Sequence, residues 1–167
     1  MMILGAFSIL LFVVSAALII NKIEDYNKQK KRVDMSFREG LLLTDLPIIT
    51  FYNGGDKVNF LLDTGASESI IDSTVIKKLH YDSLDKKGTV FGMEGNVQET
   101  EYVKLSFDYK GHFYNDEFQV VDMSSSFSRV KAETGVTLSG ILGSKFFTKY
   151  KYVLDFDELI AYSKKVW

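Results

Sequence analysis

A carboxylate followed at once by a tight turn is the most chemically suggestive feature of this 167-residue sequence. The apolar run Phe60-Leu61-Leu62 leads directly into Asp63-Thr64-Gly65-Ala66-Ser67. A carboxylate at the end of a buried strand costs free energy unless it is hydrogen-bonded or used in chemistry. Gly65 permits a tight turn and the close approach of another backbone. Taken alone, the segment fits an ordinary Asx turn, in which Asp63 only accepts backbone N–H groups.

A second short motif lies further along the chain. Two apolar residues and a glycine, Ile141-Leu142-Gly143, open a helix-like segment within GILGSKFFTKYKYVLDF. In this order, and between strand-like segments, the two motifs closely resemble the active-site signature of retropepsin-like aspartic proteases. The resemblance is to a membrane-anchored, bacterial-type member with a single Asp-Thr-Gly per subunit. It covers residues 46 to 163 and favours a catalytic Asp63 over a simple Asx turn.

The resemblance implies a mechanism in which two aspartate carboxylates face each other around one water. Two negative charges that close cannot both persist, so the pair shares one proton. The ionised member accepts a proton from the water that attacks the peptide carbonyl, and the protonated member stabilises the developing oxyanion. The implied activity is that of an aspartic endopeptidase acting on a peptide or protein substrate, without a cofactor.

The sequence contains one Asp-Thr-Gly, so one chain supplies half of such a pair. Asp155 is followed by a phenylalanine that cannot make the glycine turn, Asp45 precedes Leu-Pro, and Asp82 and Asp85 lie in a predicted polar turn. The simplest solution is a twofold homodimer, in which Asp63 meets its symmetry mate. Two alternatives stay open: a heterodimer with another aspartate-bearing chain, and a catalytically silent, membrane-tethered module that binds peptides or directs assembly.

The resemblance also assigns roles to the residues after the aspartate. Thr64 would reach across to the loop of the other subunit, Gly65 would line the cleft and accept the substrate backbone, and Ala66 would pack beside the site. Ser67 stands where many relatives carry a second aspartate that contacts the substrate main chain. A flap that closes over the peptide is expected at Gly92-Met93-Glu94-Gly95, although a plain surface hairpin has the same pattern.

Many short strand-like runs predict a mainly β domain, either a small barrel or a sandwich. The resemblance implies the small closed β-barrel of retropepsin-like acid proteases with two short helices. Asn53-Gly54-Gly55-Asp56 predicts a hairpin turn, the helices are expected at Ser73–His80 and Ser144–Tyr150, and residues 123–136 are expected to form a surface loop. The expected strands are residues 46–52, 57–62, 89–91, 98–109, 113–121, 137–142, 152–156 and 159–163.

The first twenty residues, MMILGAFSILLFVVSAALII, carry no charge. A helix of that length spans roughly 30 Å, the thickness of the hydrocarbon core of a bilayer. We therefore expect a transmembrane anchor at residues 1–20, a polar stalk at 21–40 and the protease domain at 41–167. A cleaved signal peptide is the alternative, but no basic residue precedes the apolar run. The basic residues after the run favour a cytoplasmic domain, with a translocated domain as the other possibility.

Composition argues against several other functions. The formal net charge of -2 provides no electrostatic footprint for nucleic acid. The chain has no cysteine, so neither a disulfide framework nor a thiolate nucleophile is expected. His80 and His112 do not stand in a metal-ligand spacing, so no metal site is expected. The 46% hydrophobic and 25% charged residues are typical of a globular domain.

Overall fold

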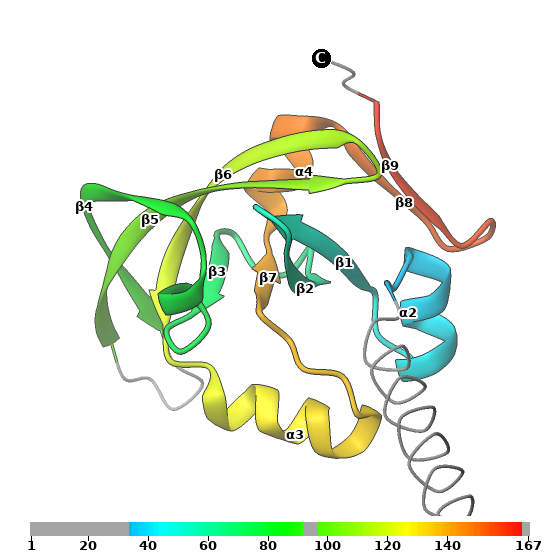
Figure 1. Ribbon diagram of the computed structural model, residues 1–167, viewed down its shortest axis with the longest axis horizontal. Helices are drawn as coiled ribbons and strands as arrows, with labels where there is room; N and C mark the ends of the chain where they lie inside the picture. Colours follow the sequence, from blue (N-terminus) through cyan, green and yellow to red (C-terminus); the bar gives the residue numbers. More distant parts are fainter. Residues whose placement is uncertain (1–33, 92–96, 165–167) are drawn as a thin grey trace, which may run out of the picture. The chain divides into compact units, whose positions relative to one another are not determined.

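The computed structural model describes residues 34–91 and 97–164 (Figure 1). The expected membrane anchor, residues 21–33 of the expected stalk, and all four expected flap residues lie outside the described residues. None of the helices within the described ranges is long and apolar enough to cross a membrane. The folded unit begins at Met35.

Six strands close into a barrel in the order β1-β2-β7-β3-β6-β5, and a pairing of Tyr52 in β1 with Asp108 in β5 completes the ring. The strand β4 continues the sheet beyond β5. The predicted closed, mainly β barrel is therefore confirmed. Its strands are β1 (Ile48–Asn53), β2 (Asp56–Leu62), β3 (Ser69–Asp72), β4 (Tyr81–Phe91), β5 (Val97–Tyr109), β6 (His112–Val121) and β7 (Gly140–Leu142).

Helices and one further hairpin accompany the barrel. In Figure 1, α3 and α4 lie at opposite ends of the barrel, and the small antiparallel sheet of β8 and β9 lies beside α2. Their bounds are α2 (Phe37–Thr44), the 3-10 helix η1 (Ile76–Lys78), α3 (Ser124–Thr134), α4 (Ser144–Tyr150), β8 (Tyr152–Asp155) and β9 (Ile160–Ser163).

The β1–β2 hairpin delivers the candidate catalytic residue. Gly54 and Gly55 adopt φ angles of 57° and 100°, as a tight hairpin turn requires. Val58, Phe60 and Leu62 alternate along β2 and are all buried, so their side chains point into the barrel. Phe60 packs at 5.3 to 5.4 Å, between ring centroids, from Phe107 and Phe118. This aromatic packing fixes the strand immediately before Asp63.

The strand β7 holds the second motif between the two strands that flank the Asp63 loop. It runs parallel to β2, with Leu62 opposite Leu142, and antiparallel to β3, with Ile70 opposite Ile141. The insertion leaves no room for a side chain at Gly140, where a Cβ would lie 2.3 Å from the carbonyl oxygen of Ile70. A glycine at this position is what permits the two motifs to meet.

Two helix predictions need correction. Ser73–His80 was predicted as a helix, but only the single 3-10 turn of η1 forms there. Residues 123–136 were predicted as a surface loop, but they contain α3. The Asp122 carboxylate accepts the N–H of Ser124 at 3.0 Å, and Phe127 is buried against the barrel. The serines that suggested a loop therefore form the first turn of a helix, where the Ser124 hydroxyl donates to Asp122 Oδ1.

Two further differences concern the ends of predicted segments. Asp82 and Asp85 were placed in a polar turn but belong to β4, and β3 was not predicted as a strand. The stalk was expected to reach residue 40, whereas Met35 and Phe37 are buried in the domain. The Met35 N–H donates to Thr50 Oγ1 at 2.9 Å, which ties this segment to β1. The short helix α4 and the β8–β9 hairpin form where they were predicted.

Candidate active site

Asp63 follows the last residue of β2, and its side chain is half-buried. Its backbone N–H donates to the carbonyl oxygen of Leu142 at 3.0 Å, which continues the β2–β7 pairing by one residue. The N–H of Gly65 donates to Asp63 Oδ1 at 2.8 Å. Within the described part of the chain, Oδ2 receives no hydrogen bond. The Asx-type bond is thus present, and it orients one carboxylate oxygen while leaving the other available.

The two residues after the second motif form hydrogen bonds to the end of the same loop. The N–H of Ser144 donates to the carbonyl oxygen of Ala66 at 2.7 Å, and the N–H of Lys145 donates to that of Ser67 at 3.3 Å. Gly143 must be a glycine, because a Cβ there would lie 2.4 Å from the carbonyl oxygen of Glu68. The structure therefore brings the Asp-Thr-Gly segment and Ile141-Leu142-Gly143 together in one hydrogen-bonded corner of the barrel.

The residues that follow Asp63 differ in exposure. Thr64, Gly65 and Ser67 are exposed, whereas Ala66 is half-buried and packs against the cluster that includes Ile141. The exposed side of the loop is accessible to a substrate or to another subunit. The expected flap residues are not described, but β4 and β5 pair on both sides of them, from Tyr81–Leu105 to Phe91–Val97.

A buried hydrogen-bonded chain supports this corner from inside the barrel. The Ser69 hydroxyl donates to Asp116 Oδ2 at 2.9 Å and accepts the N–H of Gly143 at 3.2 Å. Lys149 Nζ lies 3.4 Å from Asp116 Oδ1. Burial raises the pKa of Asp116, although the Ser69 hydrogen bond and the Lys149 charge oppose that shift. The chain thus connects β6, β3 and the first residue after β7.

Sequence reasoning did not identify Ser69 and Asp116, but the sequence contains a signal for one of them. Tyr114, Asp116 and Phe118 alternate along β6, and all three are buried. A carboxylate at a core-facing position of an otherwise apolar pattern must find partners. The pattern could have marked Asp116 as unusual. It could not have identified Ser69 as its partner, because that contact depends on the β3–β6 register.

No group of three or more His, Asp or Glu side chains within residues 34–91 and 97–164 gathers closely enough to hold a metal ion. At the corner, the Asp63 carboxylate, the Gly65 N–H that orients it and the exposed loop around them are the groups available for chemistry. A carboxylate of this kind can bind a water and exchange a proton with it.

A protein-family model and the fold of one solved domain agree with this geometry. A model of the aspartyl protease family matches residues 49–146, which contain both motifs. No curated protein matches the chain. The retroviral protease-like domain of Ddi1 from Leishmania major has a TM-score of 0.53 and 12% identity, with 72% of this chain and 90% of that chain covered. The EIAV protease complexed with the inhibitor HBY-793 has a TM-score of 0.48 and 20% identity, covering 66% of this chain and 93% of that one.

The family model spans more than half of the chain, and the Ddi1 domain shows the same fold. The two motifs, the barrel that brings them together and the family match lead to one assignment. This chain belongs to the aspartyl protease family and has a retropepsin-like fold.

Proposed function

We propose that the protein is an aspartic endopeptidase that hydrolyses peptide bonds through two Asp63 carboxylates in a homodimer. The observation that carries the proposal is the setting of Asp63. Its Oδ1 accepts the Gly65 N–H at 2.8 Å, and the loop is fixed by hydrogen bonds from Ser144 and Lys145. A carboxylate held in this way is positioned before the substrate arrives, which lowers the cost of reaching the transition state.

Each step of the hydrolysis needs a different protonation state. An ionised Asp63 accepts a proton from the bound water as the water attacks the peptide carbonyl. The protonated Asp63 of the other subunit donates a hydrogen bond to the developing oxyanion, and the leaving amine receives a proton as the C–N bond breaks. Because one carboxylate cannot serve as both acid and base in the same step, a single chain is incomplete.

The exposed face of the loop supports the dimer in this proposal. Thr64 and Gly65 are exposed beside a half-buried Asp63, so a second copy of the same loop can approach along a twofold axis. The shared proton predicts activity in mildly acidic solution and a decline in strongly alkaline solution, since the pair then loses the acid.

Cleavage of a diverse peptide mixture by the full chain at mildly acidic pH tests the activity. Asp63→Asn should abolish every cut, because the amide cannot accept the water proton. Asp82→Asn is the matched control, since it removes an exposed carboxylate on β4, and it should cut like the parent. Peptides that bind tightly but stay intact would contradict the proposal and favour a peptide-binding module.

A mixing experiment tests the dimer separately. When parent and Asp63→Asn chains are unfolded together and refolded at equal concentration, random pairing leaves about one quarter of the dimers with two aspartates. Activity should therefore fall to about one quarter of that of the same total chain concentration of parent. A fall to about one half would mean that each chain acts alone and would exclude the symmetric pair.

A further inference from the structure

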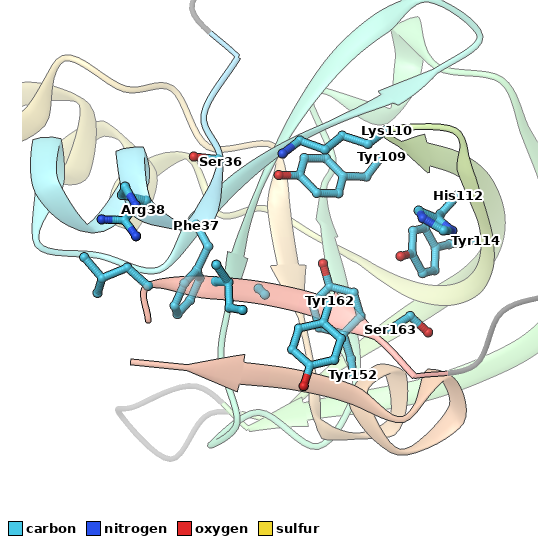
Figure 2. A pocket seen from close by; sticks show the side chains of 13 residues that line it. Ser36, Phe37, Arg38, Tyr109, Lys110, His112, Tyr114, Tyr152, Tyr162 and Ser163 are labelled. Carbon is cyan, nitrogen blue, oxygen red and sulfur yellow. The ribbon is translucent and has the colours of Figure 1, made fainter. Parts of the chain in front are cut away.

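A pocket of about 340 Å³ opens between the start of α2, the β5–β6 turn and the β8–β9 hairpin (Figure 2). None of the residues from Asp63 to Ser67 and none of the second motif lines it. Its volume lies at the lower end of the range for small-molecule sites in proteins. The pocket is therefore a place for a compact ligand, and the proposed peptidase mechanism does not use it.

Aromatic rings form much of the wall. Tyr109, Tyr114, Tyr152, Tyr162 and Phe37 all line the pocket (Figure 2). Tyr114 and Tyr152 are buried, with their ring centroids 6.1 Å apart, and therefore form a fixed part of the wall. Rings arranged in this way favour a flat or apolar ligand body, because such a body buries apolar surface against them.

The charged groups of the lining all have one sign. Arg38 and Lys110 line the pocket together with His112, and no Asp or Glu side chain does. Lys110 Nζ lies 5.2 Å from the centroid of the Tyr109 ring, and Arg38 Nη2 donates to the carbonyl oxygen of Glu158 at 2.7 Å. These contacts hold both cations in place. No carboxylate of the lining neutralises their positive charge.

The hydroxyl of Tyr152 adds a second, independent indication of a ligand. Tyr152 is 8% exposed, and its hydroxyl has no hydrogen-bond partner among the described residues. Burial raises the pKa of Tyr152, and raises that of Tyr114 to about 12, so both phenols keep their protons and can donate. A buried donor without an acceptor is unfavourable, and a ligand with an acceptor group would satisfy it.

The helix that borders the pocket does not supply this preference. Ser36 and Glu39 form a reciprocal capping box at the start of α2, with the Glu39 N–H bonded to Ser36 Oγ and the Ser36 N–H bonded to Glu39 Oε2. The first N–H groups of α2 are thus partly satisfied within the chain. The preference for a negative ligand comes from the side chains of Arg38, Lys110 and the tyrosines.

We propose that this pocket binds a small aromatic anion, with its ring between the tyrosines and its carboxylate on Arg38 and Lys110. The lining offers donors and cations to the acid group and rings to the ligand body. A neutral ligand of the same shape gains only the ring contacts, and a cationic ligand meets two like charges.

Three probes of matched shape test the charge preference. Ligand-observed NMR titrations of the full chain would compare indole-3-acetate, its neutral amide indole-3-acetamide, and the cation tryptamine, with protein-free detergent micelles as the blank. Indole-3-acetate should saturate the protein and bind about tenfold more tightly than the amide, and tryptamine should bind most weakly. Equal affinity for the three probes, or no saturable binding of the anion, would overturn the proposal.

Variants then place the binding in this pocket. Arg38→Gln and Lys110→Gln should each weaken indole-3-acetate about five- to tenfold and leave the amide almost unchanged. Lys77→Gln is the matched control, because Lys77 is an exposed cation on η1 outside the pocket. Tyr152→Phe should lower the affinity for the anion while its thermal unfolding midpoint stays at or above that of the parent. Unchanged affinity in both the Arg38 and Lys110 variants would refute the assignment, whether or not the chain cleaves peptides.

Discussion

Ser69 illustrates how a single hydroxyl can hold the candidate active site together. Because a hydroxyl has one proton, donation to Asp116 leaves its lone pairs for the N–H of Gly143. The Gly143 N–H can only donate, so Ser69 accepts there and keeps its own proton for Asp116. Ser69 therefore links β6, through Asp116, to the corner that carries Asp63.

Replacing Ser69 by alanine should lower the stability of the protein, whereas replacing it by threonine should not. Ser69→Ala removes the hydroxyl that pairs with the Gly143 N–H and with Asp116 Oδ2, and Lys149 remains only at Oδ1. The loss should lower the free energy of unfolding by about 1–3 kcal/mol. Ser69→Thr keeps the hydroxyl and is the control. Urea denaturation measures the stability, and hydrogen exchange at Gly143 should accelerate in the Ala variant. An Ala variant as stable and as protected as the parent would contradict the role of Ser69.

The protonation of Asp116 should appear in the pH dependence of stability. Because burial raises its pKa in the fold, the folded chain holds this proton to a higher pH than the unfolded chain. The contribution of Asp116 to stability is then greatest below the ordinary aspartate pKa of ~3.9 and declines as pH rises through the raised value. Asp116→Asn removes this dependence.

Denaturation of the parent and of Asp116→Asn over a series of acidic pH values would measure the effect. As pH falls from the raised pKa of Asp116 toward ~3.9, the free energy of unfolding of the parent should increase relative to that of Asp116→Asn. Above the raised pKa, the difference between the two should stay constant. Asp122→Asn provides a contrast, because hydrogen bonds from Ser124 lower the pKa of Asp122 and give the opposite sign. If the parent instead loses stability relative to Asp116→Asn as the solution becomes more acidic, the fold holds the Asp116 carboxylate in its ionised form.

Residues that make local turns were predictable, and residues that meet only in the folded barrel were not. Asp63, Gly65 and Gly143 stand in short motifs, so their neighbours in sequence identify them. Ser69 and Asp116 are separated by 47 positions, and their contact depends on the parallel pairing of β3 with β6. A one-residue change of that register would turn Asp116 to the other face, and composition or spacing does not determine it.

At the scale of elements, β7 is a strand that packs closely on both sides. Three residues of this strand separate β2 from β3, and the glycines at its two ends sit against backbone atoms. The α3 helix and η1 show the opposite situation. Their serine-, lysine- and turn-rich sequences leave several local structures open, and burial of Phe127 and Ile76 against the barrel decides between them.

Gly140→Ala should destabilise the protein through the close packing of β7. The new Cβ would lie 2.3 Å from a backbone oxygen of β3, which cannot rotate away, so we expect a loss of about 1–3 kcal/mol or more in the free energy of unfolding. Gly135→Ala is the comparison, since nothing lies within 4 Å of its Cβ and only its positive φ of 77° is strained. Urea denaturation should rank the Gly140 variant below the Gly135 variant, and the reverse order would exclude tight packing as the cause.

At the scale of the whole molecule, the predicted anchor decides where the proposed peptidase works. Residues 1–20 lie outside the described part of the chain, so the expectation still rests on their uninterrupted apolar composition. A membrane anchor would also hold two copies in one plane, which raises their effective concentration and favours a weak dimer.

The full chain should stay with membranes after alkaline extraction, whereas a chain lacking residues 1–33 should be released. The absence of cysteine makes the orientation measurable, because Thr148→Cys would introduce a single thiol at an exposed position of α4. A maleimide that cannot cross membranes should label this thiol in intact cells only if the domain is translocated. The basic residues after the apolar run predict labelling only after the cells are opened, and labelling of intact cells would reverse that orientation.

The strand β4 has a consequence for solubility. Within the described residues it pairs only with β5, so one of its edges offers backbone hydrogen-bonding groups to any other chain. Two features oppose uncontrolled edge-to-edge aggregation: an interruption of the register between Leu84 and Lys87, and the exposed charges of Asp82, Asp85, Lys86 and Lys87. The charged residues of this segment, where a polar turn was predicted, therefore disfavour the pairing of the open β4 edge with a strand of another molecule.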